Sequence, residues 1–221
     1  MVKKSQLFYT NAYKDIESKI VVTLNAHEDF LTVSTARSTR AAGDAIQDIL
    51  GEEFENILGK WCAKYSVDFA RRAMADLAFK DRDGLYYVVD VSTHRTDTYF
   101  NMPNLVSVER LARFYEDDNN YFVVLSIAYQ VSGTKVIVSS AHFAPIEFYM
   151  WDCLTIGALG WGQIQIANSN YINVRKYSRK KWMLEFCDVM LGFYPKEVIK
   201  INERLERFRR IRKFWESKPN K

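Results

Sequence analysis

Two aspartates in a predicted strand pair could together hold a divalent metal ion. Asp76 lies in the apolar, β-prone run Met74–Phe79, and Asp90 lies near the end of a second such run, Leu85–Val91. The polar segment between the two runs ends in Gly84, which predicts a hairpin. Such a hairpin would bring both carboxylates to one edge of a sheet. Carboxylate oxygens bind Mg²⁺, and an ion held there could polarise a phosphodiester and activate a water molecule.

A structural role for these aspartates is the alternative. Asp90 interrupts an apolar run, and an acid in a half-buried strand carries a desolvation cost unless a positive group compensates it. A metal ion is one such group, and an arginine partner is another. Asp90 could therefore also be an ordinary aspartate that is salt-bridged or exposed at a sheet edge.

The composition predicts a soluble, cytoplasmic chain that forms one domain over residues 1–221. The 221 residues are 48% hydrophobic and 26% charged, which is enough apolar material for a substantial core. The odd number of cysteines, without paired or metal-like spacing, argues against a disulfide framework. The chain does not open with a signal-peptide pattern, and its apolar stretches are shorter than the ~20 residues of a membrane helix. We therefore expect no membrane partner.

Apolar periodicity predicts an α/β fold with a central mixed β-sheet of about five strands, flanked by helices. The first part of the chain, about 1–70, is expected to be helical, with helices over about 7–25 and 38–65. Besides the pair at 74–91, strands are expected over 121–131, 135–140 and 163–167. Further helices are expected from Met102 to Glu116, with Pro103 in the first turn, and over about 179–191 and 196–215.

The last expected helix, about 196–215, is strongly basic. Basic side chains outnumber acidic ones between Lys196 and Lys213, so this helix could lie along phosphates. Alternatively, it is a solvated helix with acid-base pairs on its surface and the apolar side chains of Ile201 and Phe208 towards the core. The net charge of +4 is too small to indicate a polyanionic partner by itself.

Several short motifs follow one another in an order found in one nuclease family. They are the segments 38–43 (STRAAG), 75–76 (AD), 89–93 (VDVST), 101–104 (NMPN), 139–144 (SSAHFA), 148–151 (FYMW) and 163–165 (QIQ). In this order and approximate spacing, the chain resembles HincII-like type II restriction endonucleases of the PD-(D/E)xK superfamily. The resemblance covers, discontinuously, about residues 36–190.

The resemblance implies a prokaryotic, cytoplasmic enzyme of a restriction-modification system, with a restriction-endonuclease-like domain. It would act as a homodimer on a specific double-stranded DNA sequence. Asp76 and Asp90 would bind Mg²⁺ beside each scissile phosphate, and hydrolysis would leave a 5′-phosphate.

The same resemblance implies which residues contact DNA. The loop from His94 to Met102 would lie against the duplex, and its DNA-binding residues would include His94, Arg95, Asn101, Met102 and, just beyond it, Asn104. Asparagine suits base recognition because its amide offers a donor and an acceptor. Asn101 also stands where the N-cap of the helix at 102–116 is expected.

The chain departs from the family at Ser92, where the family has a catalytic lysine two residues after the second acid. A hydroxyl cannot supply the positive charge with which a lysine stabilises developing negative charge. The replacement could be a cation from elsewhere, with four candidates: Lys60, Lys64, His94 and Arg95. It could instead be a second metal ion held by a glutamate of the preceding helix: Glu52, Glu53 or Glu55. In the third alternative, the chain is catalytically inactive.

Two functions compete with the nuclease. Ser92 favours a sequence-specific DNA-binding protein of the same fold without cleavage, and Gln47, where the relative would have a helix acid, weakens the version with two metal ions. The other competitor is a structural interaction protein whose aspartates are salt-bridged. We expect no nucleotide cofactor, because the glycines of 157–162 lack the preceding strand and spacing of a phosphate-binding turn.

Overall fold

The computed structural model describes residues 4–27, 31–66, 75–98, 103–158, 160–167 and 172–219. The chain divides into two compact units, Met1–Lys176 and Tyr177–Lys221. Asn101 and Met102, two of the predicted DNA-binding residues, lie outside the described ranges. In the part of the chain that is described, no helix has the length and apolarity needed to cross a membrane.

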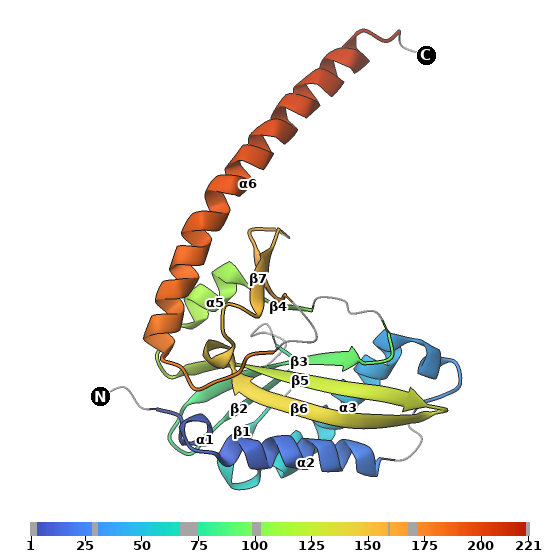
Figure 1. Cartoon of the computed structure of the whole chain (residues 1–221), viewed down its shortest axis with the longest axis vertical. Coiled ribbons are helices and arrows are strands. Elements are labelled where there is room, and N and C mark those ends of the chain that lie inside the picture. Colours follow the sequence, from blue (N-terminus) through green and yellow to red (C-terminus); the bar gives the residue numbers. More distant parts are fainter. Residues whose placement is uncertain are drawn as a thin grey trace. The chain divides into compact units, whose positions relative to one another are not determined.

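A five-stranded mixed sheet forms the centre of the first unit (Figure 1), in the order β1-β2-β3-β5-β6. β3 and β5 run parallel, and the other neighbours are antiparallel. The strands are β1 (Lys64–Tyr65), β2 (Leu77–Lys80), β3 (Tyr86–Arg95), β5 (Asn120–Ser132) and β6 (Lys135–Pro145). The predicted α/β class and the mixed sheet of about five strands are confirmed.

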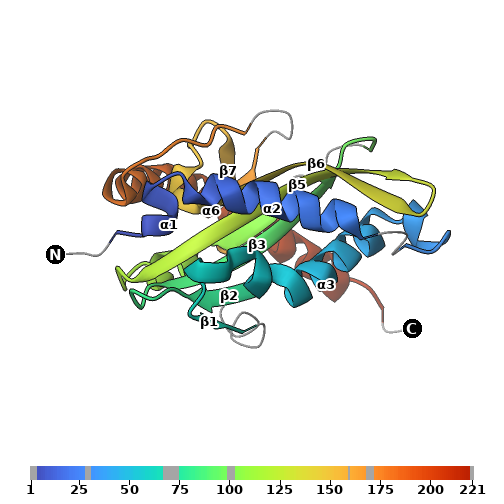
Figure 2. The ribbon, with the colours of Figure 1, turned by 90° about the horizontal axis from the view of Figure 1, so that it is seen from below.

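Helices of the N-terminal part cover one face of this sheet (Figure 2). They are α1 (Gln6–Tyr9), α2 (Ala12–Ala26) and α3 (Thr39–Leu58), with the short 3₁₀ turns η1 (Thr35–Arg37) and η2 (Gly59–Trp61). The Phe143 ring of β6 packs against Phe8 of α1 and Phe54 of α3, with ring centroids 5.2 and 5.8 Å apart. Glu17 of α2 also binds β6, because its Oε1 accepts a hydrogen bond from the Phe143 N–H at 2.9 Å. Aromatic packing and one buried carboxylate thus join this layer to the sheet.

The opposite face carries a smaller layer (Figure 1). It holds α5 (Val108–Phe114), the 3₁₀ turn η3 (Ile146–Phe148) and a second sheet of order β4-β8-β7, made of β4 (Asn104–Ser107), β8 (Gln163–Ile166) and β7 (Leu154–Gly157). Tyr115, at the end of α5, donates its hydroxyl to the buried Glu147 at 2.6 Å and accepts the Phe122 N–H at 3.3 Å. This layer covers part of the second face.

Several element predictions were wrong in this unit. Residues 64–65, expected at the end of a helix, form β1, and β7 (Leu154–Gly157) is a strand where none was expected before the glycines of 157–162. Two further differences concern the second sheet. Residues 104–107, predicted as the first turns of a helix, form β4, because Asn104, Val106 and Ser107 pair with β8 and the helix begins only at Val108. The strand at 163–166 exists as predicted, but it belongs to the second sheet, and β1 takes its place in the central one. Both differences come from pairing between distant segments, which local propensity does not encode.

The second unit is dominated by one long helix, α6 (Arg179–Glu216), in place of the two helices predicted over 179–191 and 196–215. Pro195 lies inside it. Proline removes one backbone hydrogen bond and favours a bend, yet a helix can continue through it at a cost of about 3 kcal/mol. Figure 1 shows α6 as a continuous, curved helix.

Candidate functional site

The structure brings Asp76 and Asp90 together at the start of β2. β2 pairs with β3 so that Leu77 lies opposite Val89; Asp76 directly precedes the first and Asp90 directly follows the second. The Val91 N–H donates to Oδ2 of Asp76 at 2.7 Å, and the Asp76 N–H donates to the Val89 carbonyl at 3.0 Å. These two hydrogen bonds hold Asp76 beside the residues that flank Asp90.

Both aspartates have perturbed pKa values. Burial raises the pKa of Asp76, and the hydrogen bond from the Val91 N–H opposes this rise. Burial also raises the pKa of Asp90 well above its usual value, and the nearby charge of Asp76 raises it further. Among the described residues, neither carboxylate forms an ion pair with a basic side chain. The salt-bridged alternative for these residues therefore has no partner in the described part of the chain.

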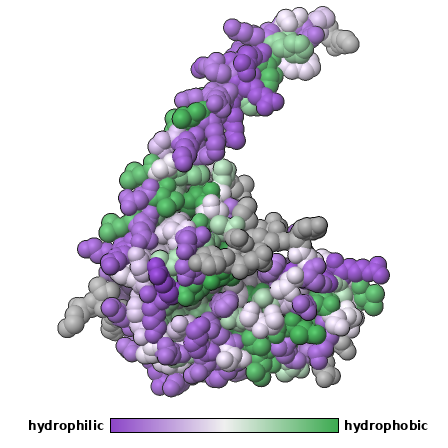
Figure 3. Space-filling view, in the orientation of Figure 1, coloured by the Kyte–Doolittle hydropathy of each residue, from purple (hydrophilic) through white to green (hydrophobic). Residues whose placement is uncertain are grey.

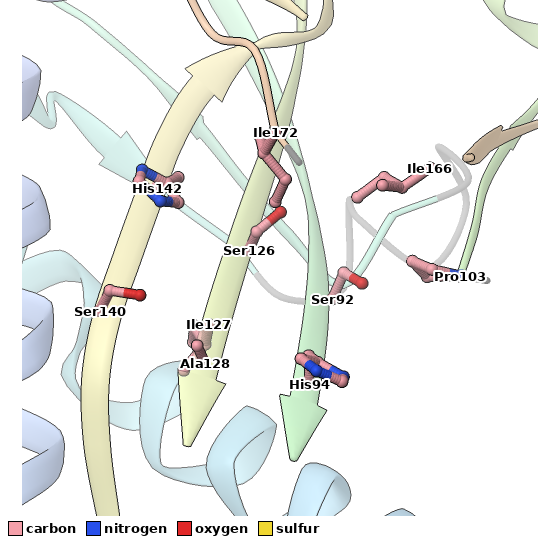
Figure 4. A pocket seen from close by; sticks show the side chains of 10 residues that line it. All are labelled: Ser92, His94, Pro103, Ser126, Ile127, Ala128, Ser140, His142, Ile166 and Ile172. Carbon is pink, nitrogen blue, oxygen red and sulfur yellow. The ribbon is translucent and has the colours of Figure 1, made fainter. Parts of the chain in front are cut away.

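A row of polar side chains continues from Asp90 along the same face of the sheet. Ser92 and His94 follow at alternate positions of β3, and alternate residues of a strand share a face. The register places Ser92 beside Ser126 of β5, and Ser126 beside His142 of β6. Figure 4 shows these side chains on three neighbouring strands.

These polar residues line a pocket of about 280 Å³. Ser140 of β6 joins them, and Pro103, Ile166 and Ile172 contribute apolar groups to the same pocket (Figure 4). Because Ile166 is the last residue of β8 and Pro103 directly precedes β4, the pocket lies between the central sheet and the smaller layer. It is a concave, partly polar site that includes Ser92, two residues after Asp90, but neither aspartate lines it.

Gln47 approaches the aspartates from α3. Its Nε2 donates to the Val91 carbonyl at 3.0 Å, while the N–H of the same residue is bound by Asp76. The helix position where an acid was expected is therefore adjacent to the site, but it carries a neutral amide. Within the described ranges, no cluster of three or more His, Cys, Asp or Glu side chains could hold a metal ion. The alternative with a second metal ion held by Glu52, Glu53 or Glu55 has no such cluster among these residues.

Of the four candidate replacements for the lysine, His94 is the one that lines the pocket with Ser92. Arg95 is held elsewhere, because it binds Asp97 through Nε at 2.7 Å and Nη2 at 3.0 Å and donates Nη1 to the Ala36 carbonyl at 2.7 Å. Lys64 lies on β1 and lines a different pocket, and the Lys60 ammonium lies over the Trp61 ring. Burial lowers the pKa of His94 below its ordinary 6.5, which favours a neutral imidazole at pH 7.

Asn104 lies on β4 and is exposed, as a residue in contact with DNA would be. Its Oδ1 accepts a hydrogen bond from Nε2 of Gln165, on the neighbouring strand β8, at 2.6 Å. Gly157 of β7 leaves room for this amide, since a Cβ there would lie 2.5 Å from Oε1 of Gln165. The second sheet thus presents a pair of amide side chains on its outer face.

Ser126, Ser140, His142 and Gln165 were not predicted as site residues. The strands of Ser126, Ser140 and Gln165 were predicted, but the strand predicted over 135–140 ended before His142. The short polar-apolar-polar sequence Ser140-Ala141-His142 is the signal that could have placed Ser140 and His142 on one face. The register between β3, β5 and β6 determines that Ser126 and His142 lie on the same face of the sheet as Asp90, Ser92 and His94. That register is a tertiary property.

The two aspartates are suitable ligands for Mg²⁺. This ion often binds through one or two carboxylates and completes its octahedral shell with water and substrate phosphate oxygens. A cation would also offset the burial and the repulsion from Asp76 that together raise the pKa of Asp90.

No protein-family model and no curated protein sequence matches this chain.

Proposed function

We propose that this protein is a type II restriction endonuclease that hydrolyses phosphodiester bonds in a specific double-stranded DNA sequence with Mg²⁺ and leaves 5′-phosphates. The main observation behind this proposal is that Asp76 and Asp90 lie next to each other and are partly buried. Among the described residues, neither has a basic partner. The resemblance of the ordered motifs to HincII-like enzymes supports the same function. It also supports a homodimer and a cytoplasmic location in a prokaryote.

In this proposal, Asp76 and Asp90 hold Mg²⁺, and the Val91 backbone positions them. The Val91 N–H fixes one carboxylate, and Gln47 fixes the Val91 carbonyl from the helix side. When bound, the ion supplies Lewis-acid polarisation of the phosphodiester and lowers the pKa of a bound water molecule. Without the ion, the negative charges of the two neighbouring carboxylates repel each other. With the ion, both charges attract the cation, so the ionised form of each carboxylate becomes favourable.

His94 takes the role of general base in the same proposal. It lies on the strand of Asp90 and lines the pocket with Ser92, and burial lowers its pKa. A neutral imidazole accepts a proton from the attacking water, and catalysis by such a group contributes typically about 10²–10⁴-fold. The Ser92 hydroxyl is a neutral hydrogen-bonding group, and among the described residues that line this pocket no lysine or arginine replaces the positive charge of the family lysine.

The proposed DNA contacts are on the second sheet and the loop before it. Asn104 and Gln165 offer amide donors and acceptors of the kind that read base edges in a groove. Asn101 and Met102 keep their predicted DNA-binding role by resemblance. For Arg95, the predicted contact would require exchange of its Asp97 partner for phosphate.

A DNA-binding protein without cleavage is the second candidate function. Ser92 in place of lysine and Gln47 in place of a helix acid both favour it. In such a protein, the aspartates would bind a metal ion that helps to dock a phosphate without hydrolysing it.

Incubation with plasmid DNA and Mg²⁺ tests the proposal. The enzyme is expected to produce discrete fragments with 5′-phosphates, and Asp76→Asn and Asp90→Asn variants should lose this activity. Sequence-specific retention of DNA in Ca²⁺ without cutting in Mg²⁺ would favour the second candidate. Cleavage that appears only in a Ser92→Lys variant would identify the missing cation as the defect. No retention and no cleavage would exclude both functions.

A further inference from the structure

α6 exposes a regular apolar stripe along its length. Apolar residues recur at alternating spacings of three and four from Leu184 to Phe208; Arg212 occupies the next position, and Trp215 follows it. The stripe is defined here as the α6 seam: Leu184, Cys187, Leu191, Tyr194, Val198, Ile201, Leu205, Phe208 and Trp215. Many of these side chains are well exposed, with 73% for Leu191, 66% for Phe208 and 67% for Trp215. Figure 3 shows hydrophobic residues along this helix among hydrophilic ones.

The period of the seam indicates the kind of partner. Leu184, Leu191, Val198 and Leu205 follow one another at steady seven-residue steps, and Ile201, Phe208 and Trp215 do the same on the other side of the seam. A seven-residue repeat with two apolar positions is the pattern of one helix winding around another. A helix packed on the curved face of a globular domain usually has a wider apolar face. The α6 seam therefore fits a second helix of similar pattern.

The charged residues beside the seam favour a second copy of α6 that packs against the first in the antiparallel direction. If Val198 lies opposite Ile201 of a second copy, Glu197 lies next to Arg204 of that copy, and the reverse pair forms by symmetry. The same register places Asp188 next to Arg209 of the second copy. Each copy thus makes opposite-charge contacts on both sides of the seam, where such pairs set partner choice and orientation.

Other arrangements place like charges together. In a parallel pair, Arg204 would lie next to Arg209 of the second copy. In antiparallel registers shifted by one repeat, Arg204 would face its own counterpart, or Glu197 would face its own. Glu197 also accepts a hydrogen bond from Lys200 of its own helix at 2.6 Å, and a carboxylate can accept from both partners.

We propose that the α6 seam is a self-association surface, on which α6 of a second copy of this chain packs antiparallel with Val198 opposite Ile201. The isologous contact is closed, because each copy contributes the same surface. The proposed function already includes a homodimer, and this inference deepens it by naming the contact surface. The inference rests on α6 alone and requires neither DNA nor metal, so its failure and the failure of the nuclease proposal are distinguishable.

Sedimentation equilibrium of the full chain, without DNA or Mg²⁺, tests this surface. The wild-type protein is expected to dimerise, and Leu205→Glu should raise the dissociation constant about tenfold or more because it buries a charge in the seam. Ile199→Glu is the matched control, since Ile199 is 60% exposed and lies off the seam. This control should dimerise as the wild type does. A chain that stays monomeric at all concentrations, or a dimer that Leu205→Glu leaves intact, would overturn the proposal.

Charge reversal tests the orientation. Arg204→Glu should weaken an antiparallel dimer, since it sets two acids side by side, and Glu197→Arg combined with it should restore the association. In a parallel dimer, Arg204→Glu alone would strengthen association by removing the repulsion from Arg209, and that result would overturn the proposed register. Far-UV circular dichroism of each variant establishes that α6 stays helical.

Discussion

At the scale of single residues, Asp90 is partly buried and its carboxyl group lies near that of Asp76; burial and the neighbouring charge both raise its pKa. The folded state therefore binds the Asp90 proton more tightly than the unfolded state does. As the pH rises from the ordinary value of 3.8 through the raised pKa, the free energy of unfolding falls. Each unit by which the pKa of Asp90 is raised in the folded state corresponds to about 1.4 kcal/mol of free energy of unfolding.

Asp90→Asn should consequently stabilise the protein at neutral pH in the absence of metal while it abolishes cleavage. The gain should shrink as the pH falls below the raised pKa, because the wild-type carboxyl is then protonated too. Urea unfolding in EDTA at a series of pH values between 4 and 8 measures this difference. A difference that does not change with pH would contradict the burial of a charged carboxylate pair.

Mg²⁺ should reverse the order of stabilities. A ligand that binds only the folded state raises its stability, so millimolar Mg²⁺ should raise the thermal midpoint of the wild type and leave Asp90→Asn unchanged. Differential scanning fluorimetry with and without Mg²⁺ reports both. An equal rise in both proteins would place the ion elsewhere.

His94 should control the pH dependence of cleavage. Because burial lowers its pKa, the imidazole is already neutral at pH 7, and the cleavage rate should rise with pH only below the ordinary 6.5. His94→Gln should lower the rate by about 10²-fold or more and remove this limb of the profile. His142→Gln is the control, because His142 lines the same pocket from β6. Equal losses in both variants would assign His94 a structural role in the pocket.

At the scale of elements, the approach of α3 to β3 depends on Gly43. A Cβ at this position would lie 2.7 Å from Oγ1 of Thr93, so Gly43→Ala should destabilise the protein by about 1–3 kcal/mol through overpacking. Gly51 of the same helix has nothing within 4 Å of such a Cβ, and Gly51→Ala should stabilise by about 0.5–1 kcal/mol. Urea midpoints of the two variants measure the contrast, and Thr93→Ala should partly restore the first. Equal effects at both glycines would contradict the close packing.

The local sequence pattern predicted some helices and strands correctly and others wrongly, and the wrong predictions have physical reasons. The hairpin that brings Asp76 to Asp90 was predictable, because short strands joined by a polar turn are specified locally. β4 was not, because Pro103 is typical of a first helical turn and only the pairing with β8 makes Asn104 a strand residue. The polar row through Ser126 and His142 likewise depends on which strands become neighbours.

At the scale of the whole molecule, double-strand cleavage links the proposed nuclease function to the proposed α6 dimer. Two active sites are needed to cut both strands at one position, and the α6 seam would supply a second copy of the chain. Double-strand cleavage should then depend on dimerisation, and at protein concentrations below the dissociation constant the rate should rise more steeply than in proportion to concentration.

Leu205→Glu separates association from chemistry, because the substitution leaves Asp76, Asp90 and the pocket untouched. This variant should nick plasmid DNA or leave it intact at concentrations where the wild type linearises it, and should recover double-strand cleavage at higher concentration. Ile199→Glu should linearise as the wild type does. Agarose gels that resolve nicked from linear plasmid over a protein titration give the comparison. If Leu205→Glu were monomeric and still linearised plasmid at the wild-type rate, the second active site would have to reach the DNA without the α6 contact.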